Sequence, residues 1–489
     1  MDNNGFCMDD YRIIGRKPEI RELEYCLGRS KPQFIIVYGR RRVGKTYLID
    51  TFFRNKFTFK FTGVYRSSQE DQLANFREEL SRKAKRDVRE LRTWSDAFFA
   101  LRDYLDESDE NEKTVVFLDE LPWMDDGSGK FLHALEYFWN QYGNARRNLV
   151  FVVAGSNTSY LVNKLIRGKG GFFKRDTTKL NLRPFNLAET REFLKSCDIE
   201  WNEKDILDCY MVLGGLPYYL QFLRPSLTPS ENIDRLLFSR GGALYDEFDE
   251  LFANLFRKSG TYITLMECVC GKRYGRTKDE IASFFGKKTT DGNLSSKLKA
   301  LCDCGFVAET VCYRDGKKKT LFRCADYFTY FYFRFVRDNQ GRNETFWTTY
   351  SQSQAAKSWS GFSFEWVCLD CLSQIKAALG ISGVRCDAFV WACSPSNDDE
   401  KEKDGAQIDL VIDRSDHMVH ICECKYTPDP YELDKEEWKD ISNKITRYQE
   451  FAKKRKTVLL TVLSPEGIKK TGYASKVFRT IDVDALFSE

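Results

Sequence analysis

The residue pattern with the clearest chemistry is a glycine-bounded loop near the N-terminus. Two glycines bracket four residues and are followed by Lys45 and Thr46, which completes the spacing G-x-x-x-x-G-K-[ST]. Glycine lets backbone N–H groups converge on a phosphate, the lysine reaches the β- and γ-phosphates, and the threonine hydroxyl holds Mg²⁺. The loop therefore predicts a site for ATP, formed by Gly39, Arg40, Arg41, Arg42, Val43, Gly44, Lys45 and Thr46.

Four further positions could act on the same nucleotide. Asp119 ends an apolar run that starts at Thr114, so it is placed to hold Mg²⁺, and Glu120 beside it can polarise the attacking water. Ser156 ends the next apolar run and could sense the γ-phosphate, although a simple strand-end cap is the alternative. Arg175 is the candidate arginine finger, with a solvated surface charge as the alternative.

A second group of polar residues lies near the C-terminus. Glu423 and Lys425 are two apart in an alternating strand, so their side chains face the same way. Asp409 precedes them on a neighbouring strand across a turn, and Glu365 opens a helix upstream. Carboxylates that converge with an ammonium suit a divalent cation, Mg²⁺ or Mn²⁺, and a lysine that either activates water or stabilises charge. The alternative is an ordinary surface Glu–Lys pair.

These groups need elements to position them, and the sequence supplies the elements. An apolar strand precedes the glycine loop and a helix, Tyr47–Phe53, follows it, which makes a chance match of the motif improbable. Strands are also predicted at 57–61, 407–413, 419–425 and 457–463, and helices at 69–86, 187–197, 203–213 and 438–451.

A basic segment lies between the two groups. Residues 257–323 carry fifteen Lys or Arg and seven Asp or Glu, hence +8, whereas the whole chain carries only +4. Three helices at 258–269, 277–285 and 294–302 and a hairpin around Asp315-Gly316 give the element order of a winged helix-turn-helix. Lys297, Lys299 and Lys317–Lys319 could contact DNA phosphates; a partner-binding module is the alternative.

Length and composition bound the protein class. A chain of 489 residues is too long for one core. The sequence shows no signal peptide and no apolar run of membrane-spanning length, so we expect no membrane contact. Sixteen Cys without an export signal indicate reduced thiols in a cytoplasm. Four of them, Cys302, Cys304, Cys312 and Cys324, fit no zinc-knuckle spacing, and we expect buried thiols.

The nucleotide motifs carry a family resemblance. The segments Gly39–Thr46, Leu118–Trp123, Gly155–Ser156, Asn163–Ile166 and Gly214–Tyr218 resemble the AAA+-type P-loop ATPases widespread in archaea and bacteria. That resemblance implies an extra strand between the phosphate-loop strand and the Mg²⁺ strand, and a helical lid after residue 184. It also implies the roles of Mg²⁺ ligand, water activator, first sensor and arginine finger for Asp119, Glu120, Ser156 and Arg175.

The C-terminal motifs carry a second resemblance. Asp409 followed by Glu423-x-Lys425, with Glu365 on a helix, is similar to the PD-(D/E)xK nuclease fold. The segments 361–365, 374–376 and 405–410 look like the C-terminal domain that is fused to these same ATPases. The resemblance implies a divalent cation at the three carboxylates and a catalytic role for Lys425.

We therefore expect a multidomain α/β protein. The predicted parts are a RecA-like P-loop core (1–184), a helical lid (185–240), a winged helix (241–326), an aromatic helix with a polar linker (327–360) and a restriction-endonuclease-like domain (361–489). The predicted function couples ATP hydrolysis to DNA binding and Mg²⁺-dependent cleavage, with self-association through the ATPase domain. The alternative is a nucleotide-switched regulator whose nuclease-like domain is silent.

Overall fold

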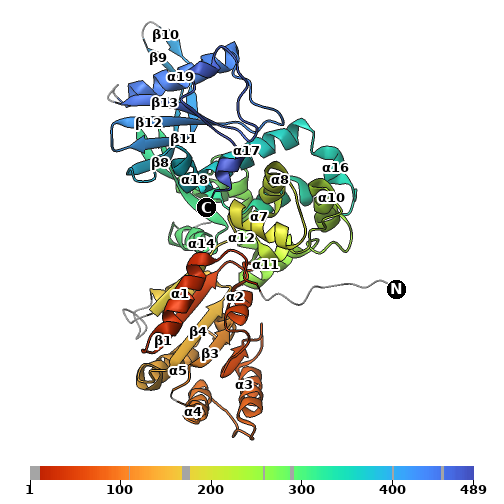
Figure 1. Ribbon diagram of the computed structural model, residues 1–489, viewed down its shortest axis with the longest axis vertical. Coiled ribbons are helices and arrows are strands. Elements are labelled where there is room, and N and C mark those ends of the chain that lie inside the picture. Colours follow the sequence, from red (N-terminus) through yellow and green to blue (C-terminus); the bar gives the residue numbers. More distant parts are fainter. Residues whose placement is uncertain are drawn as a thin grey trace. The chain divides into compact units, whose positions relative to one another are not determined.

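The computed structural model describes residues 12–109, 111–167, 177–256, 259–286, 291–398, 401–452 and 456–488. It divides into two compact units, Met1–Pro184 and Phe185–Glu489. Figure 1 labels their helices and strands.

The first unit is built around a five-stranded parallel sheet in the order β2-β3-β4-β1-β5. Strand β4 lies between β1 and β3, so the extra strand predicted between the phosphate-loop strand and the Mg²⁺ strand is confirmed. The strands are β1 (Gln33–Gly39), β2 (Phe59–Thr62), β3 (Thr114–Asp119), β4 (Leu149–Gly155) and β5 (Thr177–Leu182). The helices are α1 (Lys17–Gly28), α2 (Lys45–Phe52), α3 (Gln69–Ala84), α4 (Trp94–Leu105), α5 (Lys130–Phe138) and α6 (Thr158–Leu161).

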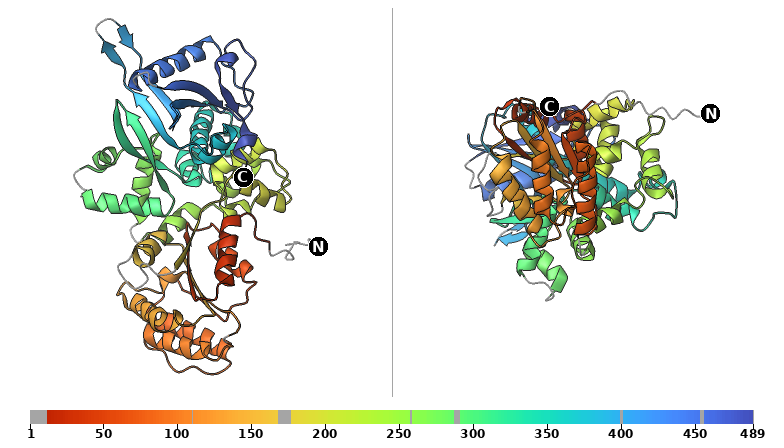
Figure 2. Two further views of the ribbon diagram at one scale, coloured as in Figure 1. Left: turned by 60° about the vertical axis from the view of Figure 1, so that its left-hand side comes forward. Right: turned by 90° about the horizontal axis from the view of Figure 1, so that it is seen from below.

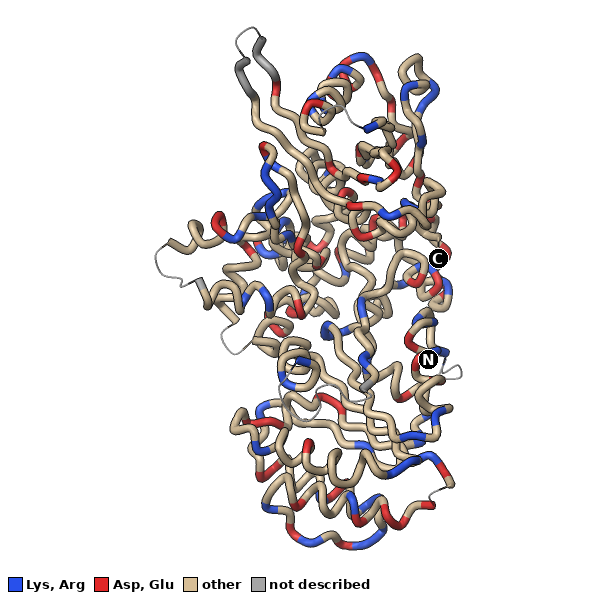
Figure 3. Tube along the Cα trace, turned by 90° about the vertical axis from the view of Figure 1, so that its left-hand side faces the viewer, with Lys and Arg blue, Asp and Glu red and all other residues tan. Residues whose placement is uncertain are grey.

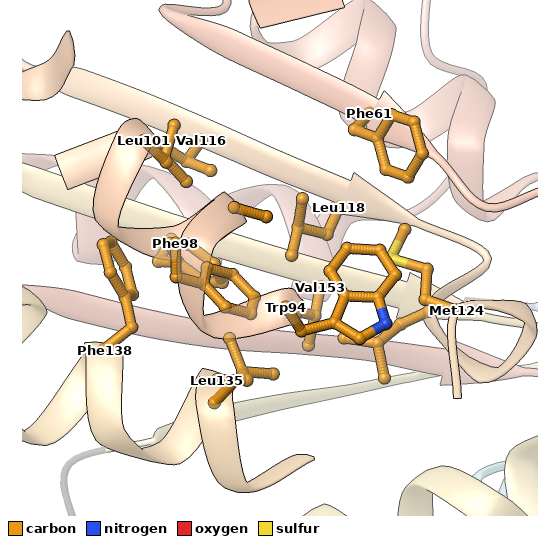
Figure 4. Close-up of a cluster of buried hydrophobic side chains, with 14 of the residues drawn as sticks. Phe61, Trp94, Phe98, Leu101, Val116, Leu118, Met124, Leu135, Phe138 and Val153 are labelled. Carbon is orange, nitrogen blue, oxygen red and sulfur yellow. The ribbon is translucent and has the colours of Figure 1, made fainter. Parts of the chain in front are cut away.

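The hydrophobic core of this unit packs the strands of the sheet against three helices. Apolar side chains of β2, β3 and β4 interlock with α3, α4 and α5, and Figure 4 shows Trp94 and Phe98 against Leu118 and Val153. Helix α4 starts where the sequence caps it: the Thr93 hydroxyl oxygen accepts a hydrogen bond from the Asp96 amide, and the Asp96 carboxylate accepts one from the Thr93 amide. Because the strands are parallel, the residues after β1, β3 and β4 meet at one edge.

The second unit begins with helices and contains the predicted lid helices α7 (Leu187–Ser196) and α8 (Glu203–Leu213). Its aromatic segment, α15 with the helical turn after it, is buried: Tyr327, Phe328 and Phe331 lie in the core, as expected of a packing element. The remaining helices are α9 (Pro217–Leu220), α10 (Pro229–Ile233), α11 (Glu247–Leu255), α15 (Tyr327–Phe331), α16 (Phe346–Tyr350), α17 (Gln354–Asp370), α18 (Leu372–Ala378), α19 (Lys435–Phe451) and α20 (Val483–Leu486).

The basic segment forms three helices and a hairpin in the predicted order. The helices are α12 (Ser259–Cys270), α13 (Lys278–Phe285) and α14 (Asp291–Asp303), and the hairpin strands are β6 (Val307–Arg314) and β7 (Lys317–Cys324). The hairpin turns at Asp315 and Gly316, which both have positive φ, 48° and 75°.

This hairpin is not a free wing. Strand β6 pairs in parallel with β8, so the hairpin belongs to a seven-stranded sheet in the order β14-β13-β12-β11-β8-β6-β7. The other strands of the sheet are β8 (Cys386–Cys393), β11 (Ala406–Arg414), β12 (Met418–Cys424), β13 (Thr457–Leu463) and β14 (Arg479–Ile481). A separate ribbon of β9 (Ser396–Asp398) and β10 (Lys401–Lys403) is visible in Figure 2.

The expectation of a polar linker at 340–360 is wrong in its second half. Helix α17 starts at Gln354, where the Ser353 side chain caps it, and continues past the predicted domain boundary to Asp370. The reason is packing: Ala356 and Trp359 are buried, and Trp359 makes edge contacts with the rings of Phe331 and Trp347.

Burial also accounts for the cysteines. Cys304, Cys312 and Cys324 are buried and Cys302 is half-buried, as expected of structural thiols. Burial raises the pKa of the Cys302 thiol to about 12. Among the residues that the structure describes, no helix is both long and apolar enough to cross a membrane.

Candidate functional site

The glycine loop connects β1 to α2 and ends at Gly44, directly before the first residue of α2. Gly44, the residue before α2, has φ 86°, and a Cβ built on it would meet nothing within 4 Å. The Lys45 ammonium is buried and donates to two loop carbonyls, those of Gly39 at 3.0 Å and Arg40 at 2.9 Å. The first N–H groups of a helix have no partner within the helix, and together with a lysine folded into the loop they suit a phosphate. Residues 40–43 complete the loop as predicted.

Thr46 and Asp119 meet across the sheet edge. The Thr46 hydroxyl, from the first turn of α2, donates to the Asp119 carboxylate at the end of β3, at 2.7 Å. Burial, and then the neighbouring Glu120, raises the pKa of Asp119. A hydroxyl and a buried carboxylate in contact fit a hydrated Mg²⁺ ion, which would sit between them and favour the ionised acid.

Glu120 and Ser156 form a second pair at the same edge. The Glu120 carboxylate accepts hydrogen bonds from the Ser156 amide at 3.1 Å and from its hydroxyl at 2.5 Å. Glu120 itself adopts a left-handed backbone conformation, with φ 47°. A non-glycine residue held there is strained, and such strain is typical of functional positions. The end of β4 thus sets the direction of the Glu120 side chain.

Arg16 supports the loop from outside the motif. Its buried guanidinium donates to the carbonyl of Val43 at 3.0 Å and to that of Arg183 at 2.7 Å. The arginine therefore ties the last part of the loop to the chain after β5. The candidate finger, Arg175, lies outside the described residues.

The C-terminal group assembles on β11 and β12. These strands pair antiparallel with Leu410 opposite Cys422, which brings Asp409 and Glu423 to the same end of the ladder. Asp409 accepts a hydrogen bond from the Cys424 amide at 3.3 Å, and the Lys425 ammonium lies 3.3 Å from a Glu423 oxygen. The same-side placement of Glu423 and Lys425 predicted from the strand period is therefore present.

Helix α17 adds Glu365 to this group, which we call the acidic cluster (Glu365, Asp409, Glu423). All three carboxylates are buried. Burial, followed by the charge of Asp409, raises the pKa of Glu365 to about 8, and the same two causes raise the pKa of Glu423. Glu365 and Glu423, which burial and repulsion disfavour as anions, need cations nearby.

Cationic side chains of the protein supply that charge. The sequence pointed to Lys425 but not to Arg273 or Lys444. Arg273, from the loop between α12 and α13, forms two hydrogen bonds with Glu365, and its guanidinium lies 3.6 Å from Asp409. Lys444, from α19, donates to both Glu423 oxygens at 3.0 and 3.1 Å. Lys425 divides its bonds between Glu423 and Glu437 of α19, the latter at 3.0 Å.

The three carboxylates are paired with protein cations. Within the described ranges, no three Asp, Glu, His or Cys side chains converge in a way that could hold a metal ion. The predicted metal ligands are therefore neighbours without forming a coordination sphere in this conformation. The sequence gives only a weak indication of the cations that pair with these carboxylates, since Arg273 is one of fifteen basic residues in its segment.

Comparisons with known proteins concern the part of the chain that holds the first site. Residues 14–223 match the family model of an ATPase domain found predominantly in Archaea. An uncharacterized protein of Methanocaldococcus jannaschii is 24% identical over 330 residues, which is 67% of this chain and 69% of that protein. An uncharacterized ATP-binding protein of the same organism is 51% identical over 44 residues, 9% of this chain and 75% of that protein.

Solved structures show similarity at lower identity. A Walker-type ATPase of Pyrococcus abyssi has 17% identity and a TM-score of 0.47, and the match covers 66% of this chain and 96% of that one. The ORC2 protein of Aeropyrum pernix has 15% identity and a TM-score of 0.41, with 68% and 96% covered. The family match, the phosphate loop and the sheet order agree: over residues 14–223 this chain carries a P-loop ATPase domain of the kind found predominantly in Archaea.

Proposed function

We propose that this protein uses ATP binding and hydrolysis to control DNA binding and metal-dependent DNA cleavage within residues 185–489. The single observation that carries the nuclease part is the assembly of Asp409, Glu423 and Lys425 at one end of the β11–β12 pair. Self-association through the ATPase domain, which sedimentation with and without ATP would detect, belongs to the same proposal.

The ATPase step follows from contacts in the first unit. Lys45 would transfer its ammonium from the loop carbonyls to the β- and γ-phosphates. Thr46 and Asp119 would hold Mg²⁺, which neutralises phosphate charge when bound. Glu120 would accept the proton of the attacking water, and its bonds to Ser156 hold the carboxylate at the same edge as the phosphate loop.

DNA binding is supported by the exposed cations of the basic segment. Lys317, Lys318 and Lys319 are exposed on β7, the edge strand of the sheet, and Lys299 is exposed on α14. Figure 3 marks the Lys and Arg positions along the trace in blue. Flexible ammonium groups on an edge strand and a helix can contact a phosphate backbone and need no base contacts. Non-specific, salt-sensitive binding is the expected behaviour.

The cleavage step rests on charge balance at the acidic cluster. Four carboxyl groups, Glu365, Asp409, Glu423 and Glu437, face three cations, Arg273, Lys425 and Lys444. A divalent cation there would supply a nucleophilic water and polarise the phosphate. Lys425, whose ammonium is kept charged because Glu423 and Glu437 outweigh the effect of burial on its pKa, would stabilise the charge that develops on the phosphate oxygens.

The test is cleavage of single- and double-stranded DNA by the full chain with ATP and Mg²⁺ or Mn²⁺. Lys425→Ala and Asp409→Asn should each abolish cleavage. The matched control is Lys469→Ala, which removes an exposed lysine paired with Glu432 at 3.0 Å, far along the chain from the cluster. Cleavage that survives in Lys425→Ala and Asp409→Asn would refute the assignment.

One observation favours a second function, that of a nucleotide-switched regulator that binds DNA without cutting it. The protein's own cations already pair with each carboxylate of the acidic cluster, and the described residues contain no converged metal-ligand set. Salt-sensitive DNA binding that responds to ATP, with no cleavage by the wild-type chain under any metal, would select this function.

A further inference from the structure

The loop between α12 and α13 enters the acidic cluster from the basic segment. Its Arg273 donates from Nε to one Glu365 oxygen at 3.0 Å and from Nη2 to the other, while Nη2 lies 3.6 Å from Asp409. The next residue, Tyr274, donates its hydroxyl to the same Asp409 oxygen at 2.9 Å. Two consecutive side chains therefore occupy oxygens of two of the three carboxylates.

Several contacts hold Arg273 in this position. Its guanidinium lies over the rings of Tyr274 and Phe362, with centroid distances of 4.6 and 4.4 Å. Its carbonyl accepts a hydrogen bond from the indole of Trp366 at 3.1 Å. Phe362 and Trp366 are on α17 close to Glu365, so the helix that carries the acid also binds both ends of the arginine. A solvated surface arginine would have none of these contacts.

The backbone of the loop is anchored as well. Gly275 has φ 84°, and a Cβ on it would lie 2.3 Å from the carbonyl oxygen of Phe322. Arg276 exchanges backbone hydrogen bonds with Phe322 of β7, at 3.0 and 2.8 Å. The loop is thus fixed to the strand that carries the exposed lysines, and a movement of that hairpin relative to α17 would move Arg273.

The chemistry of the contact excludes a metal. A guanidinium that bonds both Glu365 oxygens and lies near Asp409 occupies the space and the lone pairs that a divalent cation would use. Two cations cannot share those oxygens at bonding distance, because their repulsion adds to the loss of ligands. Arginine remains charged throughout the accessible pH range, so only displacement of the side chain frees the acids.

We propose that Arg273 and Tyr274 form an autoinhibitory plug that keeps divalent cations out of the acidic cluster until the α12–α13 loop moves. This rests on the proposed function, since it assigns a regulator to the same cluster. In the observed conformation the plug prevents a metal ion from binding to the cluster. The loop that must move to release the plug belongs to the basic segment, which is the segment proposed to contact DNA. Removal of the plug must therefore raise metal affinity without any change in the ligands.

The experiment measures Mn²⁺ binding to the full chain by calorimetry, without nucleotide, for wild type and Arg273→Met. Methionine keeps the unbranched stem of the side chain as far as the position of Nε, but it has no guanidinium and carries no charge. The matched control is Lys272→Met, which removes the neighbouring cation; that lysine pairs with Glu280 at 2.7 Å, outside the cluster. Asp409→Asn, alone and combined with Arg273→Met, identifies the binding that belongs to the cluster.

We expect Arg273→Met to bind Mn²⁺ about tenfold more tightly or better, because two charge-assisted hydrogen bonds no longer compete with the metal. Lys272→Met should bind like wild type, and the gain should vanish in the double variant with Asp409→Asn. Tyr274→Phe, which keeps the ring and loses only the hydroxyl bond to Asp409, should show a smaller gain and guards against misfolding of the arginine variant.

The outcomes separate the two proposals. Equal, Asp409-dependent affinity in wild type, Arg273→Met and Tyr274→Phe would overturn the plug and leave the metal site intact. A gain in affinity without DNA cleavage by Arg273→Met would support the plug and count against the nuclease. Absence of any Asp409-dependent binding in all of these proteins would overturn both.

Discussion

His420 makes the stability of the second unit dependent on pH. The imidazole is on β12 with no exposed surface, and Nδ1 lies 3.0 Å from the Thr461 hydroxyl of β13. Its Nε2 lies 3.2 Å from the Arg414 guanidinium, which can only donate, so Nε2 must be the unprotonated acceptor. Protonation would turn a hydrogen bond into a contact between two cations. Burial, and then Arg414, lowers the pKa of His420 to about 4.

The size and sign of the effect follow from linkage. An unfolded histidine has a pKa of about 6.5, so the folded state binds fewer protons than the unfolded state between the two values. The contribution of His420 is fully present above about pH 6.5 and is lost as the pH falls toward 4. A difference of about 2.5 pKa units corresponds to about 3 kcal/mol in total, of which about 2 kcal/mol is lost by pH 5.

The assay is urea unfolding at pH 7.5, 6 and 5 for wild type and His420→Gln. Glutamine can bond both Thr461 and Arg414 and does not titrate. ATP should shift the transition of the nucleotide-binding unit, which identifies the other transition as that of residues 185–489. Between pH 7.5 and 5 the free energy of unfolding of wild type should fall by about 2 kcal/mol more than that of His420→Gln.

The control is His417→Gln, which changes an exposed histidine in the adjacent turn and should track wild type at every pH. If wild type and His420→Gln lose stability in parallel over this range, the imidazole is not held neutral by its surroundings, and the argument from Arg414 fails.

Three further predictions concern the ATPase edge and the hairpin. Lys45→Ala should abolish nucleotide binding, whereas Glu120→Gln should bind ATP and leave it unhydrolysed; filter binding and phosphate release distinguish the two, and equal turnover in both would refute the roles. Replacing Lys317–Lys319 by Gln should flatten the salt dependence of DNA affinity, since fewer counterions are released; an unchanged slope would make the segment a partner-binding module. Gly39→Ala should lower the unfolding midpoint of the first unit, because the new Cβ would lie 2.1 Å from the Leu182 carbonyl oxygen; an unchanged midpoint would show that β5 can shift away.

The sequence predicted best what depends on local spacing. The glycine loop, the strand ending at Asp119 and the helices α7 and α8 are each determined by a short run of residues, and all are present. The same-side placement of Glu423 and Lys425 follows from the strand period alone. The contacts of Glu120 with Ser156 required only that parallel strands end at one edge.

What the sequence could not predict depends on distant segments meeting. Arg273 and Glu365 are 92 residues apart, and no local pattern distinguishes that arginine from its basic neighbours. The polar composition around Gln354 concealed the start of α17, because the deciding side chains are buried against an aromatic helix elsewhere in the chain. Pairing of β6 with β8 likewise joins segments that composition assigns to different domains.

The shared seven-stranded sheet has a consequence for any attempt to isolate the C-terminal part of the chain. A fragment that begins at residue 361 would lack β6 and β7, and β8 would become an edge strand. Its Phe389, Val390 and Trp391 are now covered, and Val390 packs against Cys312 and Leu321 of the hairpin. An apolar strand with unpaired amides is a template for aggregation, so such a fragment should precipitate. A fragment that retains the hairpin, such as 307–489, keeps both edges of β8 paired and should remain dispersed.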